Sequence, residues 1–132
     1  FTPHTVEMSR LMGLEREYIE DNRLVTAKEF AEENGVTLIL KGHHTIVTGQ
    51  DGEQYINITG NSGLATGGSG DVLAGMTASI LAQGASAFSS AAAAVYLHGL
   101  AGDIAAEKYG KISMLPTDLI NCIPLAYKRC GF

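Results

Sequence analysis

The sequence predicts an α/β protein in which helices cover a sheet, and two observations support this prediction. Residues 36–40 form a continuous apolar run, the pattern of a strand buried on both faces of a parallel sheet. Helical patterns stand on both sides of that run, and those at residues 71–83, 86–109 and 117–129 follow only three strands. Because three such helices need more sheet to cover, we expect the chain to form the C-terminal half of a larger layered α/β/α domain.

The first residues predict a turn followed by a helix. Residues 1–4 look like the end of a strand that enters a turn at Pro3, because proline fixes its own φ and forces the preceding residue to be extended. A helix is expected over residues 6–13, and the polar residues 16–22 are expected to be a connector.

A second helix is expected over residues 27–34. Thr26 would cap it, Glu29 at the third position would complete a capping box, and Gly35 would end it. Beyond the strand at residues 36–40, the pattern predicts a hairpin: a strand at 45–48, a turn at 50–53 and a returning strand at 54–58.

Residues 61–71, called here the glycine-rich loop, run into an apolar helix expected from Asp71 to Gln83. Because few side chains crowd this backbone, its N–H groups can converge on an anion, and the start of the helix adds the positive end of its dipole. The predicted anion hole consists of Gly67, Gly68, Ser69 and Gly70.

Asp71 stands beside this anion site, where a carboxylate repels the ligand unless it has a role of its own. One interpretation is that Asp71 only caps the helix, for which aspartate is a favoured residue. The other is a general base, which takes a proton from a hydroxyl while the glycine amides hold the phosphoryl group that the hydroxyl attacks. Spacing alone leaves both interpretations open.

An alanine-rich helix is expected from Ser86 or Ser89 to Tyr109, and Gly110 would end it. His98 inside it is interpreted as a hydrogen-bonded core residue rather than a metal ligand. Its polar residues are interpreted as a solvated face: Asp103, Glu107, Lys108 and Lys111.

The last helix would be capped by Thr117 or Asp118 and kinked or divided at Pro124. If Cys122 and Cys130 both lie on it, they are ~12 Å apart along its axis, too far for a disulfide. This favours a reducing compartment such as the cytoplasm.

Residues 41–45, Lys-Gly-His-His-Thr, follow the buried strand directly. In open α/β sheets ligands bind at the carboxyl ends of strands, so Lys41 would offer a cation to phosphate or ribose and Gly42 a close backbone approach. The alternative is a surface loop with a solvated lysine.

The histidines do not predict a metal site. His43 and His44 are adjacent, so in a strand they would point to opposite faces, and no third ligand stands near them in the sequence. His4, in a turn at a strand end, is better placed to meet a substrate.

Composition excludes several classes of partner. The 132 residues are 45% apolar and 17% charged, with a net charge of −5 and no cluster of Lys and Arg. A nucleic-acid groove and an anionic membrane surface are therefore not expected, and neither a membrane span nor a signal peptide is recognisable. A phosphate ligand would have to be held by backbone amides and one or two cations.

Five motifs occur in one order: Thr-Pro-His-x-x-Glu at 2–7, Lys-Gly-x-x-Thr at 41–45, Asn-x-Gly-Leu-Ala-Thr-Gly-Gly-Ser-Gly-Asp at 61–71, His-Gly at 98–99 and Pro-Thr-Asp-Leu at 116–119. In this combination the chain resembles the ADP- or ATP-dependent NAD(P)H-hydrate dehydratases, which have a ribokinase-like fold. The glycine-rich loop is shared with ribokinase-like kinases, whereas the full set is specific. The resemblance covers residues 1–132 and implies the C-terminal part of the family's domain. At positions 5–6, Thr-Val departs from the usual Pro-Gly.

The resemblance implies roles for individual residues. His4 and Asp71 would contact the hydrated nicotinamide, with Asp71 as the catalytic residue. The adenine nucleotide would contact Lys41, Gly42, His43, His44, Thr45 and Gly70.

The implied activity is the nucleotide-dependent dehydration of hydrated NADH or NADPH, a metabolite-repair reaction, with ADP or ATP as co-substrate and Mg²⁺ as cofactor. The resemblance also implies a homo-oligomer and a fused or separate NAD(P)H-hydrate epimerase. One alternative is a kinase of the same fold acting on a sugar or a hydroxymethylpyrimidine, in which Asn commonly stands where this chain has His4. Another is a non-catalytic piece that binds nucleotide or a partner.

Overall fold

The computed structural model describes residues 1–132, which form two compact units. The first unit comprises residues 1–57 and 86–92, and the second comprises residues 58–85 and 93–132. No helix combines the length and the apolar character that crossing a bilayer requires.

The first unit contains a three-stranded sheet in the order β1 (Leu38–Leu40), β2 (Ile46–Thr48), β3 (Gln54–Ile56). Both pairs are antiparallel. The pair of β2 with β3 confirms the predicted hairpin, whereas the pairing of β1 with β2 differs from the parallel sheet expected for residues 36–40. The other edge of β1 is covered by the start of the chain, because Phe1 O and Pro3 O accept hydrogen bonds from the backbone N atoms of residues 39 and 41, each at 2.8 Å. The run at 36–40 is therefore paired on both edges, but only this second pairing is parallel.

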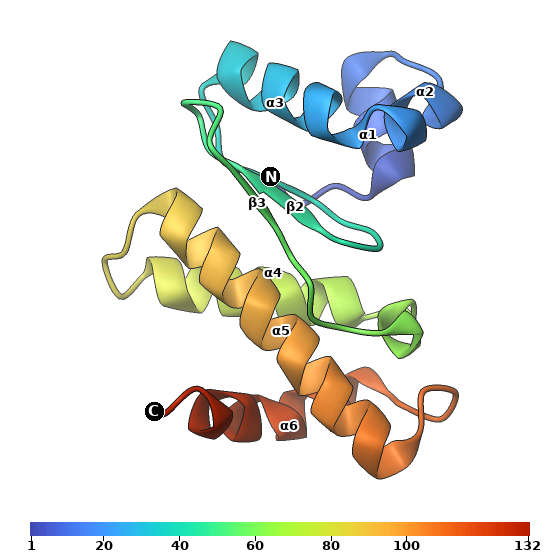
Figure 1. The fold of residues 1–132 in the computed structure, drawn as a ribbon, viewed down its shortest axis with the longest axis vertical. Helices are drawn as coiled ribbons and strands as arrows, with labels where there is room; N and C mark the ends of the chain where they lie inside the picture. Colours follow the sequence, from blue (N-terminus) through green and yellow to red (C-terminus); the bar gives the residue numbers. More distant parts are fainter. The chain divides into compact units, whose positions relative to one another are not determined.

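Helices α1 (Thr5–Met12), α2 (Arg16–Asp21) and α3 (Arg23–Asn34) lie on one side of this sheet (Figure 1). Their apolar side chains and those of the strands form one core. It comprises Met8, Ile19, Ala27, Phe30, Ala31, Leu38, Leu40 and Ile46.

Two predictions in this region are wrong. Residues 16–22 are mostly helical, not a connector, because Ile19 is buried in the core and Arg16 pairs with Glu20 one turn on at 2.7 Å. Thr26 does not cap α3 but lies inside it, buried, with its hydroxyl donating to the carbonyl of Asn22 at 2.9 Å. Tertiary burial thus extends the helix beyond its local start signal.

Helix α5 (Ala87–Tyr109) begins in the first unit and continues into the second. Its predicted limits are confirmed, since Ser86 Oγ accepts a hydrogen bond from Ser89 N at 3.1 Å and Gly110 follows with φ +81°.

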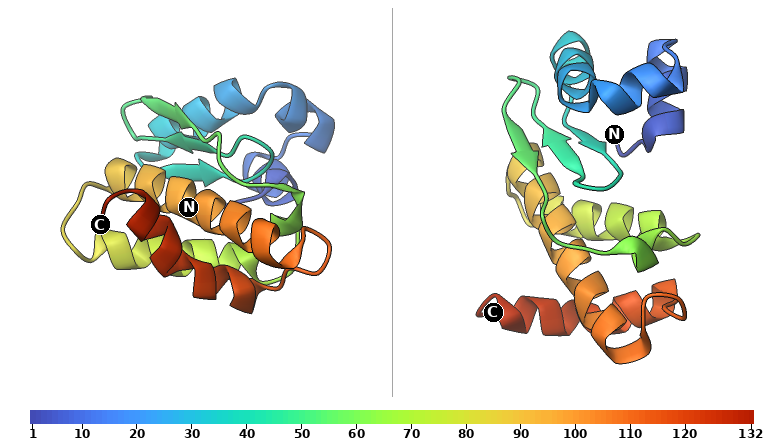
Figure 2. Two further views of the ribbon diagram at one scale, coloured as in Figure 1. Left: turned by 60° about the horizontal axis from the view of Figure 1, so that its bottom comes forward. Right: turned by 45° about the vertical axis from the view of Figure 1, so that its right-hand side comes forward.

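The second unit adds a short 3₁₀ helix, η1 (Ser62–Leu64), and helices α4 (Ser69–Leu81) and α6 (Pro116–Arg129). Helix α4 packs against α6 (Figure 2). Arg129 of α6 pairs with Glu107 of α5 at 3.2 Å.

The predicted start of α6 is wrong. Pro116 occupies its first turn, and Asp118 Oδ2 accepts a hydrogen bond from Leu115 N at 2.9 Å, so Asp118 supports the cap from the third position. The helix is not divided at Pro124. Cys122 is buried and Cys130 exposed, and both are free.

Candidate functional site

The glycine-rich loop has a shape that only glycine permits at its central turn. Gly68 has φ +94° and is the N-cap of α4, which therefore begins two residues earlier than predicted, at Ser69. A Cβ on Gly68 would lie 3.0 Å from Pro116 Cγ, so the start of α6 lies directly against the loop. Gly67 faces open space, because a Cβ placed there would meet nothing within 4 Å.

Asp71 is the third residue of α4 and is exposed. Helix α4 has no side-chain cap, and the carboxylate of Asp71 forms no hydrogen bond or ion pair. The capping interpretation is therefore wrong, although a negative charge in the first turn still interacts favourably with the helix dipole. Asp71 thus follows loop residues 67–70 directly in the sequence, and its carboxylate has no partner within this chain.

Helix α5 contacts both ends of the glycine-rich loop. Asp103 accepts hydrogen bonds from the backbone of Gly60 and the side chain of Asn61, so its assignment to a solvated face is wrong. His98 is buried and lies 3.0 Å from the carbonyl oxygen of Ser69, which confirms it as a hydrogen-bonded core residue. Sequence reasoning missed both loop contacts, because nothing in the spacing of these residues shows what α5 packs against.

His4 in the first unit is the N-cap of α1. Its Nδ1 accepts a hydrogen bond from Glu7 N at 3.1 Å, and Glu7 Oε2 accepts one from His4 N at 2.7 Å. This capping box places the proton of a neutral His4 ring on Nε2. Thr5 fits the first helical position, so the departure from Pro-Gly leaves the turn intact.

The structure brings His4 and Lys41 together through Glu7. The backbones of His4 and Lys41 form a parallel bridge, and Lys41 Nζ lies 3.6 Å from Glu7 Oε2. The pKa of Glu7 is lowered, chiefly by the hydrogen bond from the His4 backbone and further by the charge of Lys41, while burial opposes the shift. Glu7 was not predicted as a site residue, although it belongs to the motif that carries His4.

The Lys41–Thr45 loop is closed by its own side chains and by α3. Thr45 Oγ1 donates to Gly42 O at 3.0 Å, and Arg23 donates to the carbonyls of Leu40 and His43. Gly42 has φ +153°, a conformation that other residues rarely adopt, and a Cβ there would lie 2.9 Å from Arg23 Nη2, so a larger residue would also displace the end of this side chain.

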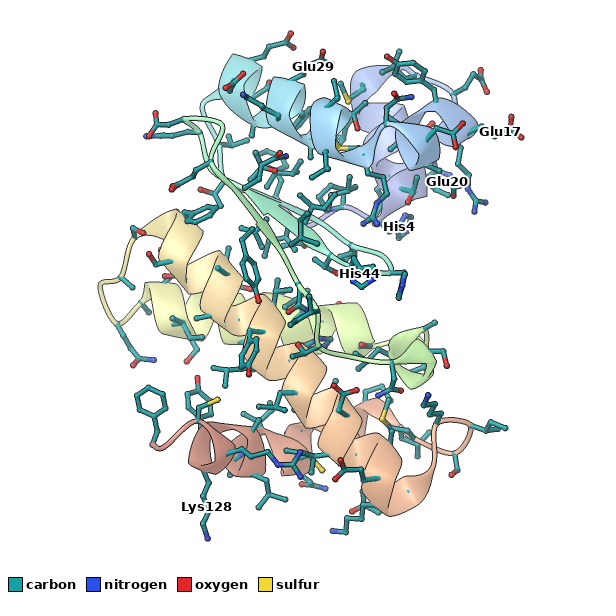
Figure 3. All side chains as sticks on the ribbon, viewed as in Figure 1. His4, Glu17, Glu20, Glu29, His44 and Lys128 are labelled. Carbon is teal, nitrogen blue, oxygen red and sulfur yellow. The ribbon has the colours of Figure 1, made fainter.

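The rings of the two adjacent histidines of this loop are in contact, tilted by 51° to each other, instead of pointing to opposite faces. Their ring centroids are 3.9 Å apart, because His44 adopts a left-handed conformation with φ +53° that breaks the strand geometry. His44 Nδ1 lies 3.2 Å from the carbonyl oxygen of Asn57 and so carries the proton. Figure 3 shows His4 and His44 at the same end of the sheet, where β1 passes into β2.

The residues expected to bind ligands thus form two groups, one in each unit. His4 and the loop at 41–45 belong to the first unit, whereas residues 67–71 belong to the second. No three His, Cys, Asp or Glu side chains gather in an arrangement that could hold a metal ion.

A family model described as NAD(P)H-hydrate dehydratase matches residues 1–125. The chain belongs to this family. It is 46% identical over 128 residues to the bifunctional NAD(P)H-hydrate repair enzyme of Moorella thermoacetica, covering 97% of this chain and 24% of that protein. The ADP-dependent (S)-NAD(P)H-hydrate dehydratase of Bacillus subtilis is 33% identical over 97% of this chain and 46% of its own length. The chain therefore spans a quarter to a half of these relatives.

Solved structures confirm the fold class and the resemblance. The ADP/ATP-dependent NAD(P)H-hydrate dehydratase of B. subtilis, co-crystallised with ATP and Mg²⁺, superposes with a TM-score of 0.93 at 33% identity, over 97% of this chain and 46% of that one. A ribokinase-like superfamily protein of Enterococcus faecalis superposes with a TM-score of 0.83 at 39% identity, over 98% of this chain and 43% of that one. The chain has the architecture of part of a ribokinase-like NAD(P)H-hydrate dehydratase.

Proposed function

We propose that the complete protein containing this chain converts hydrated NADH or NADPH back to the reduced cofactor, with ADP or ATP as phosphoryl donor. Residues 1–132 would be the C-terminal part of the dehydratase domain. Family membership supports the reaction. The observation that carries the assignment of a base is the unengaged carboxylate of Asp71 beside the glycine-rich loop.

The hydrate carries a hydroxyl on a saturated ring carbon, and hydroxide is a poor leaving group. Asp71 takes the hydroxyl proton while the oxygen attacks the terminal phosphoryl group of the nucleotide. The amides of residues 67–70 stabilise the charge that develops on that group. The carbon–oxygen bond then breaks, phosphate leaves with the electron pair, and loss of a proton from the neighbouring ring carbon restores the double bond.

The residues of this chain fit a requirement for Mg²⁺. Mg²⁺ keeps several waters and binds mainly through nucleotide phosphates with one or two carboxylates, so a dedicated side-chain cage is not needed. This chain has no cluster of carboxylates and imidazoles that could hold an ion by itself, which is compatible with a mode in which the nucleotide supplies most of the ligands. The ion would supply neutralisation of the phosphate charge.

The remaining proposed contacts are mostly in the first unit. Its residues 41–45 would bind the nucleotide, as would Gly70 of the second unit. The Nε2–H of a neutral His4 would donate a hydrogen bond to the substrate, since Nδ1 is already engaged. The free cysteines support a reducing compartment such as the cytoplasm. Bifunctional relatives support an epimerase working with this enzyme, and a homo-oligomer is part of the same proposal.

The test uses the complete protein, NADH hydrate, Mg²⁺ and either nucleotide, and follows the recovery of reduced-cofactor absorbance. Asp71→Asn should abolish turnover while nucleotide affinity, measured by calorimetry, is retained. Asp51→Asn is the matched control, because Asp51 is an exposed carboxylate in the hairpin turn of the first unit. Full turnover by Asp71→Asn would refute the role of this residue. A stable phosphorylated product from a sugar or pyrimidine, with no dehydration, would instead establish a kinase.

A further inference from the structure

Helix α5 fixes the start of the glycine-rich loop through one carboxylate. Asp103 Oδ2 accepts a hydrogen bond from Gly60 N at 2.9 Å, and Oδ1 accepts one from Asn61 Nδ2 at 2.9 Å. The Asn61 amide also donates to Gly102 O at 3.0 Å, while Asn61 Oδ1 accepts from Gly63 N at 2.9 Å. The side chain of Asn61 is thereby held in one orientation, and it holds the first turn of η1 in place.

The same helix fixes the end of the loop through an imidazole. His98 Nε2 lies 3.0 Å from Ser69 O and 3.3 Å from Ser69 Oγ. A carbonyl oxygen only accepts hydrogen bonds, so Nε2 carries the ring proton and donates a hydrogen bond to the carbonyl oxygen of Ser69. His98 is 8% exposed and Ser69 4%, so water cannot replace this hydrogen bond if it is lost.

Between these two anchors the side chains of residues 64–68 form no hydrogen bond. Asp103 and His98 are therefore the side chains of α5 that hold the loop by hydrogen bonds, and Ser69 lies only two residues before Asp71 in the first turn of α4. If this turn moved by about 1 Å, the reacting group that it carries would be misplaced, and a misplacement of this size can lower the rate about 100-fold.

We propose that Asp103 and His98 are positioning residues, which hold the two ends of the glycine-rich loop and thereby set the direction of the turn that carries Asp71. This inference rests on the function proposed above. Neither side chain meets a reacting atom; each acts through the loop backbone. Helix α5 thus determines the geometry of the anion hole through its His-Gly pair at 98–99 and its Gly-Asp pair at 102–103.

The first test compares two replacements of His98 in the complete protein. In His98→Gln the amide nitrogen can donate to Ser69 as Nε2 does, whereas His98→Leu fills the space without a donor. We expect kcat to fall about tenfold or more in His98→Leu and to be largely retained in His98→Gln. A role in packing alone predicts the opposite order, because leucine suits a buried site better than glutamine.

Val95→Ala is the matched control for lost stability, since Val95 is buried on the same helix one turn earlier. If His98→Leu loses no more activity than a Val95→Ala variant with the same melting temperature, His98 has no positioning role.

The second test concerns Asp103, which is only partly buried, so its replacement should be tolerated better than that of a core residue. Asp103→Ala should lower kcat and speed the hydrogen exchange of the loop amides, measured without any substrate. Glu107→Ala removes the same charge one turn later, where the carboxylate pairs with Arg129 and not with the loop, and should change neither. Unchanged exchange in Asp103→Ala would refute the anchoring itself, whereas a wild-type protein without turnover would refute the proposed function.

Discussion

Gly99→Ala is expected to destabilise the protein, although alanine is the better helix former. An ideal Cβ on Gly99 would lie 2.2 Å from Thr59 Oγ1 and 2.7 Å from both the carbonyl carbon and the carbonyl oxygen of Thr59. Two of these three atoms belong to the backbone, so rotating a side chain cannot relieve the overlap. The segment that leads into the glycine-rich loop would have to move away from α5.

The magnitude follows from three terms. Alanine in place of glycine inside a helix gains about 1 kcal/mol. Overpacking of a close contact costs about 1–3 kcal/mol. Displacing Thr59 also breaks its hydrogen bond to Tyr96 O, now 2.9 Å long, which contributes about 1 kcal/mol. The free energy of unfolding should therefore fall by about 1–3 kcal/mol.

Gly102→Ala on the same helix is the control. Its Cβ would lie 2.8–2.9 Å from three atoms that all belong to the side chain of Leu64. A shift of that side chain away from its preferred rotamer costs about 0.5–1.5 kcal/mol, which roughly cancels the gain in helix propensity. Gly102→Ala should therefore be nearly as stable as the wild type.

The assay is urea denaturation of the complete protein, followed by circular dichroism, for the wild type and both variants. Because the two substitutions are chemically identical and share a helix, their difference isolates the effect of a backbone neighbour. A Gly99→Ala protein as stable as Gly102→Ala would refute this reasoning.

Two further predictions concern a buried histidine and a half-buried arginine. Burial lowers the pKa of His98 from its usual 6.5, so the unfolded state takes up a proton that the folded state does not. The contribution of the neutral ring to stability is present above pH 6.5 and is lost as the pH falls below it. The urea midpoint should therefore fall less steeply with decreasing pH in His98→Gln than in the wild type. Equal dependence of the two midpoints on pH would contradict this prediction. Arg23→Met removes two donors from the carbonyls of Leu40 and His43, and should cost about 1–3 kcal/mol and raise the KM for the nucleotide. The control Arg16→Met breaks only an exposed ion pair with Glu20. If Arg16→Met lowered the stability and raised the KM as much as Arg23→Met does, Arg23 would have no specific role.

Local signals in the sequence were sufficient where the residues at an element's end determine its geometry. Gly13, Gly35 and Gly110 were predicted to end helices, and all three have positive φ. The hairpin around residues 50–53 was predicted from its turn, because two short strands joined by a tight turn specify their own register. The motifs were likewise enough to identify the family and the ribokinase-like fold.

Local signals failed where burial outweighs propensity. The segment 16–22 is polar on average, yet one buried isoleucine and one ion pair across a turn make most of it helical. Thr26 has the residue type of a cap but is buried inside α3. For Asp71 the residue type suited both a cap and a base, and only the observed N-cap at Gly68 removed the first interpretation.

The sequence by itself determined which residues could perform chemistry, because motifs record residue types and spacing along the chain. The tertiary structure alone showed that Glu7 joins His4 to Lys41, and that Asp103 and His98 hold the glycine-rich loop. Apart from the local His4–Glu7 capping box, these contacts link positions that are far apart in sequence. Whether they form depends on which face of α1 meets the end of β1 and which face of α5 meets the glycine-rich loop. The sequence can indicate that a side chain is solvated or buried, but the residue that it contacts is determined only when the chain has folded.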